Sequence, residues 1–479
     1  MTLEPMSHSI FAPCRRIHLI GICGTAMASL AGMLRTRGFE VTGSDQNIYP
    51  PMSTFLEEMG IPLFLGFSEQ HLAEARPDLV VVGNAISRGN AEVEFALDQK
   101  IRYSSLPEIM KEFFVRGHQS IVVAGTHGKT TTTSLVAWLF EHAGLDPSFL
   151  IGGIAENFGS SFKLGQGGFF IIEGDEYDTA FFDKGPKFLH YLPDWVVFNN
   201  CEYDHADIYP DVASVQTSFR RLINMIPRNG RLFSGWDDLT VRELSGKAFC
   251  PVISYGLEDS PVWKADSIDF REESTRFVAW KDGRKWAAVE ISLAGAFNVK
   301  NALAAVACAE AAGIPLATVE EGLRRFRNVK RRLEIRGVIR GVTVFDDFAH
   351  HPTAIRETLT AVRTRFPPNR IWAIYEPRSA TSRRNVFQKE LSASFGAADM
   401  IILCSPFAPQ KLDPAILLDV EEVIRSLRRG GKNAEHSCSA QEILDTVVPR
   451  LQAGDKVVIM SNGGFDDIHR KMLEALRRG

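Results

Sequence analysis

A short glycine turn near residue 125 carries the residue types that bind nucleotide phosphates. Gly125 and Gly128 would let the backbone close around an anion. Lys129 would reach the outer phosphates, and Thr130 would bind Mg²⁺. An apolar stretch precedes the turn and residues suited to a helix start follow it, so backbone N–H groups would converge on one place. The turn is shorter than the standard phosphate loop, because Val123 stands where that pattern has glycine. It predicts binding of ATP or GTP.

Acidic and histidine side chains follow two further apolar stretches. Phe169–Ile172 runs directly into Glu173, and Trp195–Phe198 runs into a segment that holds Asp204 and His205. A carboxylate at such a strand end is where a phosphate-binding enzyme needs a ligand for its Mg²⁺. Carboxylate and imidazole together suit a metal that bridges phosphates. A solvated acidic loop is the alternative interpretation of the second segment.

A second glycine turn lies near the N-terminus. Gly21 and Gly24 follow an apolar stretch, and Asp45 ends the next predicted strand. This spacing is similar to a dinucleotide-binding fingerprint, but Cys23 and Ala26 replace its second and third glycines. A phosphate-bearing ligand other than NAD fits this turn better. A strand, turn and helix without any ligand is the alternative.

Three more polar clusters are candidates for ligand binding. Asn298 and Asn301 open an alanine-rich helix, where Asn298 is either an N-cap or a contact to a base. Residues 346–351 place two acids and two histidines after a predicted strand, which is a poor pattern for a core. The cations of residues 378–384 suit a substrate that bears a carboxylate, although an exposed charged patch explains them equally well.

Strands and helices alternate along the chain in three groups, and they position these residues. Strands are predicted at residues 17–20, 79–82, 169–172, 195–198, 342–345, 371–375, 400–403 and 456–460, with helices from Gly24 to about Arg37 and over Asn298–Ala312. Such alternation indicates parallel sheets with helices on both faces. The polar segment Lys111–Gln119 reads as a linker. The fold class is α/β, with three consecutive α/β domains at residues 1–117, 118–328 and 329–479.

Composition excludes several classes of protein. A length of 479 residues has room for about three domains. A net charge of −4 gives no basic footprint for nucleic acid or an acidic membrane surface. Seven scattered cysteines without a C-x-x-C pair indicate reduced thiols rather than disulfides or a zinc finger. No apolar run approaches the roughly 18 residues of a membrane span, and the N-terminus lacks the apolar core of a signal peptide. We expect a soluble, cytoplasmic enzyme.

In chain order, these motifs resemble the Mur ligases, the ATP-dependent amide-bond-forming enzymes of peptidoglycan metabolism. The motifs that carry the resemblance are GTHGKTTT, the acids from Glu173, the Asp204–His205 pair, FNxxNA at Asn298, Arg331–Arg332 and DDFAHHP at Asp346. The segments NIYPPMST, GDEYDTAFFDK, EYDHADIY and YEPRSATSRR look most like the branch that joins L-alanyl-γ-D-glutamyl-meso-diaminopimelate to UDP-N-acetylmuramate during recycling. The branch that adds L-alanine to UDP-N-acetylmuramate is the alternative.

The resemblance implies the site residues and the reaction. It implies ATP contacts at Gly125, Thr126, His127, Gly128, Lys129, Thr130, Thr131, Asn298, Asn301, Arg332, Asp346 and His350. It implies UDP-sugar contacts at Gly21, Cys23, Gly24, Thr25, Asp45 and Asn84, and peptide contacts at Arg378, Thr381 and Arg383. Thr130 and Glu173 would hold one Mg²⁺ and His205 a second ion near the acyl phosphate, and Lys129, Glu173 and His205 would be catalytic. The sugar carboxylate would attack the γ-phosphate of ATP to form an acyl phosphate, from which the peptide amine would displace phosphate.

The resemblance also implies domain roles and partners. The N-terminal domain is expected to be Rossmann-like and to bind the UDP sugar, and the central domain to be P-loop ATPase-like, with a mostly parallel sheet that binds ATP. The C-terminal domain is expected to be Rossmann-like and to bind the peptide. Partners would be UDP-N-acetylmuramate, ATP and the tripeptide, with neither nucleic acid nor membrane, and the chain would act as a monomer or weak dimer. A nicotinamide-dependent oxidoreductase and a nucleotide-sensing regulator are the alternatives from other classes.

Overall fold

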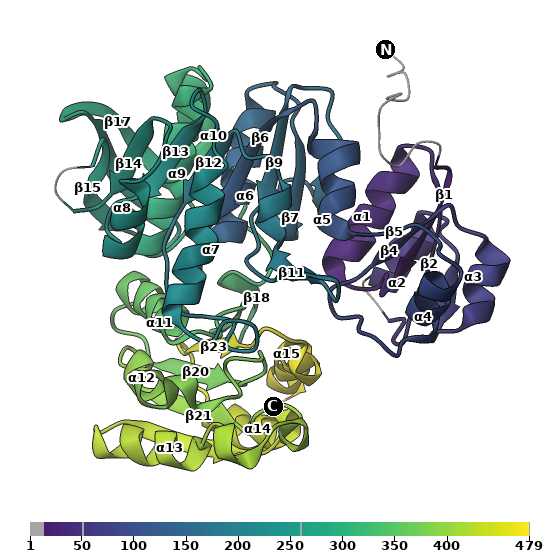
Figure 1. Ribbon diagram of the computed structural model, residues 1–479. Coiled ribbons are helices and arrows are strands. Elements are labelled where there is room, and N and C mark those ends of the chain that lie inside the picture. Colours follow the sequence, from purple (N-terminus) through teal and green to yellow (C-terminus); the bar gives the residue numbers. More distant parts are fainter. Residues whose placement is uncertain (1–13, 50–51, 259–260, 479) are drawn as a thin grey trace.

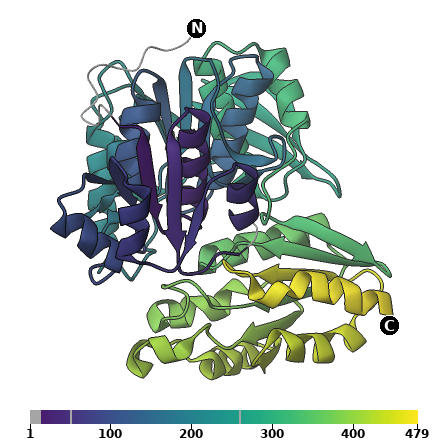
Figure 2. The same ribbon diagram turned by 90° about the vertical axis from the view of Figure 1, so that its right-hand side faces the viewer.

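A computed structural model describes residues 14–49, 52–258 and 261–478. Residues 50–51 of the NIYPPMST segment and the first 13 residues lie outside this description. The chain forms three α/β units in line, each built on its own main sheet, as the sequence predicts (Figure 1). The third unit lies below the other two in both ribbon views (Figure 2).

The first unit is a five-stranded parallel sheet in the order β3-β2-β1-β4-β5, which is the order of a Rossmann-like sheet without its sixth strand. Its strands are β1 (Arg16–Ile20), β2 (Glu40–Asp45), β3 (Leu63–Leu65), β4 (Leu79–Val82) and β5 (Tyr103–Ser105). Its helices are α1 (Thr25–Thr36), α2 (Met52–Glu58), α3 (Glu69–Ala75), α4 (Ala91–Asp98) and α5 (Leu106–Met110).

The segment at residues 111–119, predicted as a linker, is not one. It continues α5 as a π-helical turn, η1 (Lys111–Val115), and β6 begins at Gln119. Phe114 and Val115 are fully buried, and the guanidinium of Arg37 lies 5.2 Å above the ring of Phe114. The segment belongs to the core because its polar residues flank two apolar side chains that pack inward.

The middle unit is a ten-stranded sheet in the order β17-β16-β15-β14-β13-β12-β6-β9-β7-β8. Its strands are β6 (Gln119–Ala124), β7 (Ser148–Ala155), β8 (Ser160–Lys163), β9 (Phe169–Glu173), β12 (Trp195–Phe198), β13 (Arg231–Gly235), β14 (Val252–Gly256), β15 (Trp263–Phe270), β16 (Thr275–Lys281) and β17 (Arg284–Ile291). Its helices are α6 (Lys129–His142), α7 (Val212–Asn224), α8 (Leu239–Ser245), α9 (Ala296–Ala311) and α10 (Leu316–Arg324), and a hairpin of β10 (Asp178–Ala180) and β11 (Asp183–Pro186) leads to the short helix η2 (Lys187–His190). The central strands are parallel, and β8, β16 and β17 add antiparallel pairings at the two edges.

The third unit is a six-stranded sheet in the order β18-β19-β23-β20-β21-β22, parallel except for the edge strand β18. Its strands are β18 (Glu334–Ile339), β19 (Val342–Asp347), β20 (Ile371–Tyr375), β21 (Met400–Cys404), β22 (Asn433–Ser437) and β23 (Lys456–Met460). Its helices are α11 (Pro352–Arg365), α12 (Gln388–Ser394), α13 (Val420–Arg429), α14 (Ala440–Val447) and α15 (Ile468–Arg478), with short 3₁₀ turns at 385–387, 409–411, 414–416, 448–450 and 465–467.

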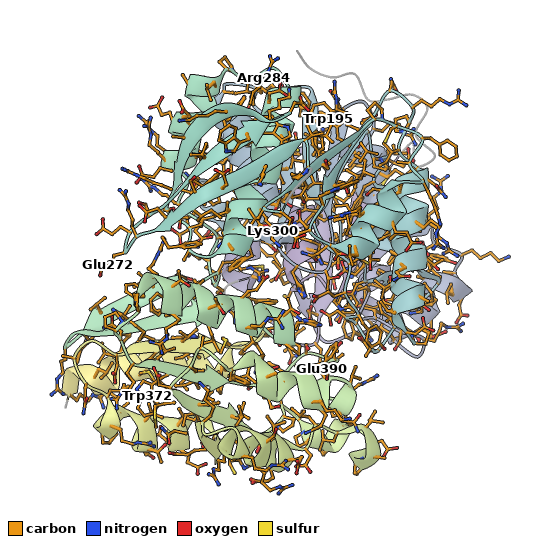
Figure 3. All side chains as sticks on the ribbon, turned by 90° about the vertical axis from the view of Figure 1, so that its left-hand side faces the viewer. Trp195, Glu272, Arg284, Lys300, Trp372 and Glu390 are labelled. Carbon is orange, nitrogen blue, oxygen red and sulfur yellow. The ribbon has the colours of Figure 1, made fainter. Side chains whose placement is uncertain are left out.

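Buried apolar strands hold the ligand-bearing loops in place. Val122, Val123 and Ala124 of β6 are fully buried between β9 and β12, so the turn that follows them leaves from the centre of the sheet. Side chains fill the middle unit around Trp195 and the third unit around Trp372, both nearly inaccessible (Figure 3). None of the described helices has the length and apolar character needed to cross a membrane.

The first unit packs directly on the middle one through α1. Ser29 Oγ lies 2.8 Å from Ser161 Oγ across this contact. Gly32 allows the close approach, because a Cβ there would lie 2.7 Å from the ring of Phe55 and 2.9 Å from the ring of Phe162. This contact brings the start of α1 toward the phosphate-binding turn.

Candidate functional site

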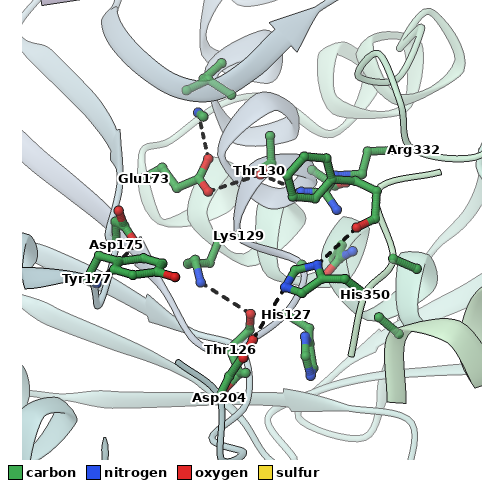
Figure 4. Close-up of a pocket in the computed structure, with 18 of the residues that line it drawn as sticks. Thr126, His127, Lys129, Thr130, Glu173, Asp175, Tyr177, Asp204, Arg332 and His350 are labelled. Carbon is green, nitrogen blue, oxygen red and sulfur yellow. Dashed lines mark hydrogen bonds and ion pairs between the residues drawn. The ribbon is translucent and has the colours of Figure 1, made fainter. Parts of the chain in front are cut away.

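One cavity of about 400 Å³ is bounded by all three units (Figure 4). Its lining combines the phosphate-loop residues with acids, histidines and a few apolar side chains. It includes Thr25, Leu106, Thr126, His127, Gly128, Lys129, Thr130, Thr131, Glu173, Asp175, Tyr177, Lys187, Asp204, His205, Asn298, Asn301, Arg332, Asp347, Phe348, His350 and Glu357. Such convergence of polar groups in one concave site is typical of a ligand pocket.

The turn between β6 and α6 forms one wall of the cavity. Its two glycines have φ of +130° and +79° at Gly125 and Gly128. A Cβ at Gly128 would lie 2.6 Å from Oδ1 of Asn301, so glycine is required both for space and for conformation. No side chain caps the N-terminus of α6. Its first N–H groups are therefore available to an anion in the cavity.

Lys129 is the buried cation at the centre of the site. Its Nζ donates to Oε2 of Glu176 at 2.7 Å and to the Gly125 carbonyl at 2.8 Å. Burial lowers the pKa of Lys129, but the charges of Glu176 and Asp175 outweigh burial and raise that pKa above its ordinary value. The lysine therefore stays charged, which suits the binding of phosphate oxygens.

Glu176 joins Lys129 to His205. The His205 Nε2 lies 3.0 Å from Oε1 of Glu176, whose side chain is only 2% exposed. Burial raises the pKa of Glu176, but the charge of Lys129 and the hydrogen bond to His205 outweigh burial and lower that pKa. Glu176 is therefore an ionised carboxylate between two basic side chains.

This arrangement gives a stability prediction for the Glu176→Gln variant. A carboxyl group with a lowered folded-state pKa stabilises the protein above its unfolded pKa of about 4.5, and that contribution disappears as the pH falls further. Breaking a buried ion pair costs about 3 kcal/mol, so we expect the midpoint of thermal unfolding to fall by about 5–10 °C at pH 7. Thermal unfolding of both proteins between pH 7 and pH 3 should show that the gap between their unfolding midpoints becomes smaller below pH 4.5. A gap that widens in acid would contradict the role of Glu176.

Glu173 and Thr130 supply the oxygens expected of a Mg²⁺ site. Thr130 Oγ1 donates to Oε1 of Glu173 at 3.1 Å, and the Gly152 N–H donates to its other oxygen at 2.8 Å. Burial raises the pKa of Glu173, against the lowering effect of Lys129. A cation beside this carboxylate would relieve the cost of burying its charge. An oxygen-only donor set matches the preference of Mg²⁺, so these residues fit the expected ion.

The third unit closes over the cavity through two segments. Arg332 Nη2 donates to Thr130 Oγ1 at 3.0 Å, directly beside the phosphate loop. His350 Nε2 lies 3.7 Å from Oδ2 of Asp204. The edge of the cavity beside the phosphate loop therefore contains side chains from both the middle unit and the third unit.

The loop after β12, residues 203–206, makes further contacts with the third unit. The Ala206 N–H donates to Thr381 Oγ1 at 3.0 Å, and the Ala206 carbonyl accepts from Arg384 Nη1 at 2.7 Å. The His351 Nε2 lies 3.2 Å from the carbonyl of Tyr203. The loop contributes a backbone N–H or carbonyl group to each of these three contacts.

The cavity brings together most of the expected ATP and metal residues. Thr126, His127, Gly128, Lys129, Thr130, Thr131, Glu173, His205, Asn298, Asn301, Arg332 and His350 line it, and so does Thr25. Asn298 Nδ2 donates to the Ala294 carbonyl at 2.8 Å, and its Oδ1 accepts from Asn301 at 3.0 Å. Gly125 lies in the same turn but is not part of the lining.

Asp346, expected at ATP, faces the other side of its strand. Its Oδ1 lies 3.3 Å from Nε2 of His469 and 3.4 Å from Nε of Arg331. The following residue, Asp347, lines the cavity instead. The two residues differ because successive side chains of a strand point to opposite faces. A contact between Asp346 and ATP stays a prediction.

The residues expected to bind the UDP sugar form a separate turn in the first unit. The Cys23 N–H donates to Oδ2 of Asp45 at 2.9 Å, and the Gly21 N–H donates to the Ser44 carbonyl at 2.8 Å. Gly24 precedes α1 as its N-cap, and Asn84 is exposed just after β4. Of the residues expected at the UDP sugar, Thr25 alone lines the cavity, which reaches this turn at Thr25 and Ala26.

The residues expected to bind peptide lie at the carboxyl ends of the third sheet. The guanidinium of Arg378 stacks 3.8 Å above the ring of Phe407, and Arg383 Nη1 donates to the Phe407 carbonyl at 3.2 Å. Thr381 contacts Ala206 as described above. This cluster lies outside the cavity lining, so a role in peptide binding stays a prediction.

Lys187 and Glu357 line the cavity but were not singled out in the sequence. Lys187 Nζ lies 2.6 Å from Oδ2 of Asp175 and 5.7 Å from the ring centre of Tyr177. Glu357 lines the cavity from α11. Lys187 arrives through the β10–β11 hairpin, and its sequence neighbours carry no motif, so only the fold reveals its position.

Comparison with known protein families gives three matches in chain order. Residues 16–118 match the model described as Mur ligase family, catalytic domain, and residues 123–309 match the Mur ligase middle domain. Residues 331–463 match the model described as Mur ligase, glutamate ligase domain. Together they span most of the chain.

Individual relatives cover nearly the full length. The chain is 42% identical to the UDP-N-acetylmuramate–L-alanyl-γ-D-glutamyl-meso-2,6-diaminoheptandioate ligase of Escherichia coli, over 97% of this chain and 98% of that protein. It is 32% identical to the UDP-N-acetylmuramate–L-alanine ligase of Clostridium acetobutylicum, over 94% and 95% of the two chains.

Solved structures agree with these matches. A murein peptide ligase from Psychrobacter arcticus superposes with a TM-score of 0.73 at 38% identity, covering 96% of this chain and 98% of that one. A UDP-N-acetylmuramate–alanine ligase from Thermotoga maritima superposes with a TM-score of 0.79 over 97% and 99% of the two chains, and at 23% identity it supports the fold alone.

Proposed function

The chain belongs to the Mur ligase family, and on that premise we propose that it joins L-alanyl-γ-D-glutamyl-meso-diaminopimelate to UDP-N-acetylmuramate. ATP supplies the energy and leaves as ADP and phosphate. The observation that carries the ligase assignment is the cavity in which Lys129, Glu173 and His205 face the third unit. The choice of acceptor is supported by the 42% identity to a relative named for this tripeptide, against 32% to one named for L-alanine.

In the first step, an oxygen of the sugar carboxylate forms a bond to the γ-phosphorus of ATP, and the bond from that phosphorus to the bridging oxygen of ADP breaks. Lys129 and the open N-terminus of α6 would balance the charge of the transferring phosphoryl group. Arg332, beside Thr130, would add a second cation. The products of this step are ADP and an acyl phosphate.

In the second step, the peptide amine bonds to the acyl carbon, loses a proton, and the bond to the phosphate oxygen breaks. Holding the two substrates in line provides most of the acceleration in such a reaction. Thr130 and Glu173 would hold one Mg²⁺ and His205 a second metal ion, and such ions when bound neutralise phosphate charge. The cations near Arg378 and Arg383 would orient the acidic peptide.

We also propose that each of the three domains binds a different substrate. Residues 1–117 would bind the UDP sugar, 118–328 would bind ATP, and 329–479 would bind the peptide. The three separate sheets and the three matched ranges support boundaries close to these positions. We further propose a cytoplasmic location and a monomer or weak dimer. All seven cysteines are free, as is typical of a reducing compartment.

Phosphate and ADP release with UDP-N-acetylmuramate and two alternative acceptors tests the proposal. We expect the tripeptide to give a kcat/KM at least about 100-fold higher than L-alanine, because a site built for a larger charged acceptor loses its polar contacts with the smaller one. Turnover with L-alanine alone would place the protein in the alanine-adding branch. If neither acceptor supports ADP release, the ligase proposal is wrong.

A further inference from the structure

A cluster of two histidines and a glutamate lies where the phosphate loop, the loop after β12 and the third unit meet. His127 Nε2 is 2.9 Å from Oε2 of Glu202, and His351 Nδ1 is 3.4 Å from the same oxygen. One potential ligand atom from each residue lies within 4.8 Å of the other two. Within residues 14–49, 52–258 and 261–478, this is the only group of three or more such side chains with this geometry.

We propose that His127, Glu202 and His351 bind Zn²⁺ or a similar divalent transition metal, at a site separate from the Mg²⁺ site at Glu173. Two imidazoles and one carboxylate are a donor set that zinc accepts readily and that Mg²⁺ does not favour. A tetrahedral zinc with bonds of about 2.0–2.1 Å separates its ligand atoms by about 3.3 Å. The separation of 3.4 Å between His351 and Glu202 matches that value, and the 2.9 Å between His127 and Glu202 would lengthen on binding.

The partners of these side chains are those that orient metal ligands. The His351 Nε2 lies 3.2 Å from the carbonyl of Tyr203, so its N–H donates there and leaves Nδ1 unprotonated. Thr353 Oγ1 donates to the second carboxylate oxygen of Glu202 at 3.1 Å. Hydrogen bonds of this kind fix the ring and carboxylate orientation around bound metals.

The cluster contains a pair of acceptors that face one another. The unprotonated Nδ1 of His351 and the carboxylate of Glu202 are 3.4 Å apart, and a cation between them would relieve the repulsion of their lone pairs. The Thr353 N–H also points at this Nδ1 from 3.2 Å, and a bound metal must displace that contact.

A metal here would join three segments that belong to two units. His127 comes from the turn before α6, Glu202 from the loop after β12, and His351 from the residue that caps α11. Binding would therefore hold the third unit against the phosphate loop and raise the midpoint of thermal unfolding. Because His127 belongs to the expected ATP site, zinc and ATP would change each other's affinity by the same factor.

Equilibrium dialysis of chelator-treated protein against ZnCl₂ in excess Mg²⁺ tests this site without any substrate, so its outcome is independent of the ligase proposal. We expect one Zn²⁺ per chain and an affinity at least tenfold lower in His351→Asn and in Glu202→Gln. Asparagine still caps a helix, so the first variant keeps the start of α11. Circular dichroism checks that both variants fold.

The matched control is His205→Gln, which removes a different buried histidine–carboxylate pair, that of His205 with Glu176. We expect it to leave the zinc affinity within twofold of the wild type. Co²⁺ in place of zinc should give the visible spectrum of a four-coordinate site, and that spectrum should be lost in His351→Asn. No bound zinc, zinc retained in both ligand variants, or zinc lost in the His205 variant instead would overturn the proposal.

Discussion

Replacing Lys129 with alanine is expected to lower the rate of ADP and phosphate release by about 10³-fold, with the UDP sugar still bound. Among the described residues, Lys129 is the one lysine that lies at the start of α6 and contacts both the phosphate-loop backbone and Glu176. Its loss removes a positive charge from the position of the transferring phosphate. The measurements are single-turnover ADP release and calorimetric titration with UDP-N-acetylmuramate.

The matched control for this variant is Lys163→Ala. Lys163 also pairs with two carboxylates, Glu141 and Asp146, but it lies on β8 outside the cavity lining. We expect its turnover to stay within twofold of the wild type. Wild-type rates in the Lys129 variant would show that the phosphate loop does not serve the reaction.

The second large effect is expected from Glu173→Gln. Glutamine keeps the shape of the side chain, but its single carbonyl oxygen can accept from only one of Thr130 and Gly152, and it lacks the negative charge that a Mg²⁺ ligand supplies. We expect ADP release at saturating ATP to fall by about 10²–10³-fold. We also expect the Mg²⁺ concentration for half-maximal rate to rise. Mg²⁺ titrations of the initial rate, followed by ADP release, measure both effects.

Glu156→Gln is the control for the charge change. Glu156 is half-buried near Asn328 and Glu334, outside the cavity lining, and burial raises the pKa of its carboxyl group. The same isosteric change there should leave the Mg²⁺ dependence unaltered. If Glu173→Gln keeps the wild-type Mg²⁺ dependence, the ion does not depend on this carboxylate.

Buried parallel strands were the part of the fold that the sequence predicted best. Short apolar runs such as Leu79–Val82 and Trp195–Phe198 coincide with β4 and β12, because a strand buried on both faces needs apolar residues throughout. The antiparallel strands β15, β16 and β17 were not anticipated, since one face of each alternates with charged residues. The Asp282–Gly283 turn between β16 and β17, with both φ positive, was the available signal for a hairpin there.

Site residues were predictable where they follow a central strand and unpredictable where they depend on tertiary folding. Glu173 and His205 meet Lys129 because the carboxyl ends of β9, β12 and β6 lie at one edge of the sheet. Lys187 reaches the same place through a hairpin whose path no local pattern records. The choice between Asp346 and Asp347 also depended on which face of β19 the third unit turns toward the cavity.

The loop at residues 203–206 presents backbone groups to Thr381, Arg384 and His351 of the third unit. Every amino acid offers the same carbonyl, and all but proline offer the same N–H. Evolutionary drift at position 206 can therefore alter the side chain without breaking its two backbone contacts, whereas Thr381 and Arg384 have no such freedom. Covariation between the two surfaces would be weak, and a scan of all substitutions at Ala206 would single out proline as the change that removes a donor.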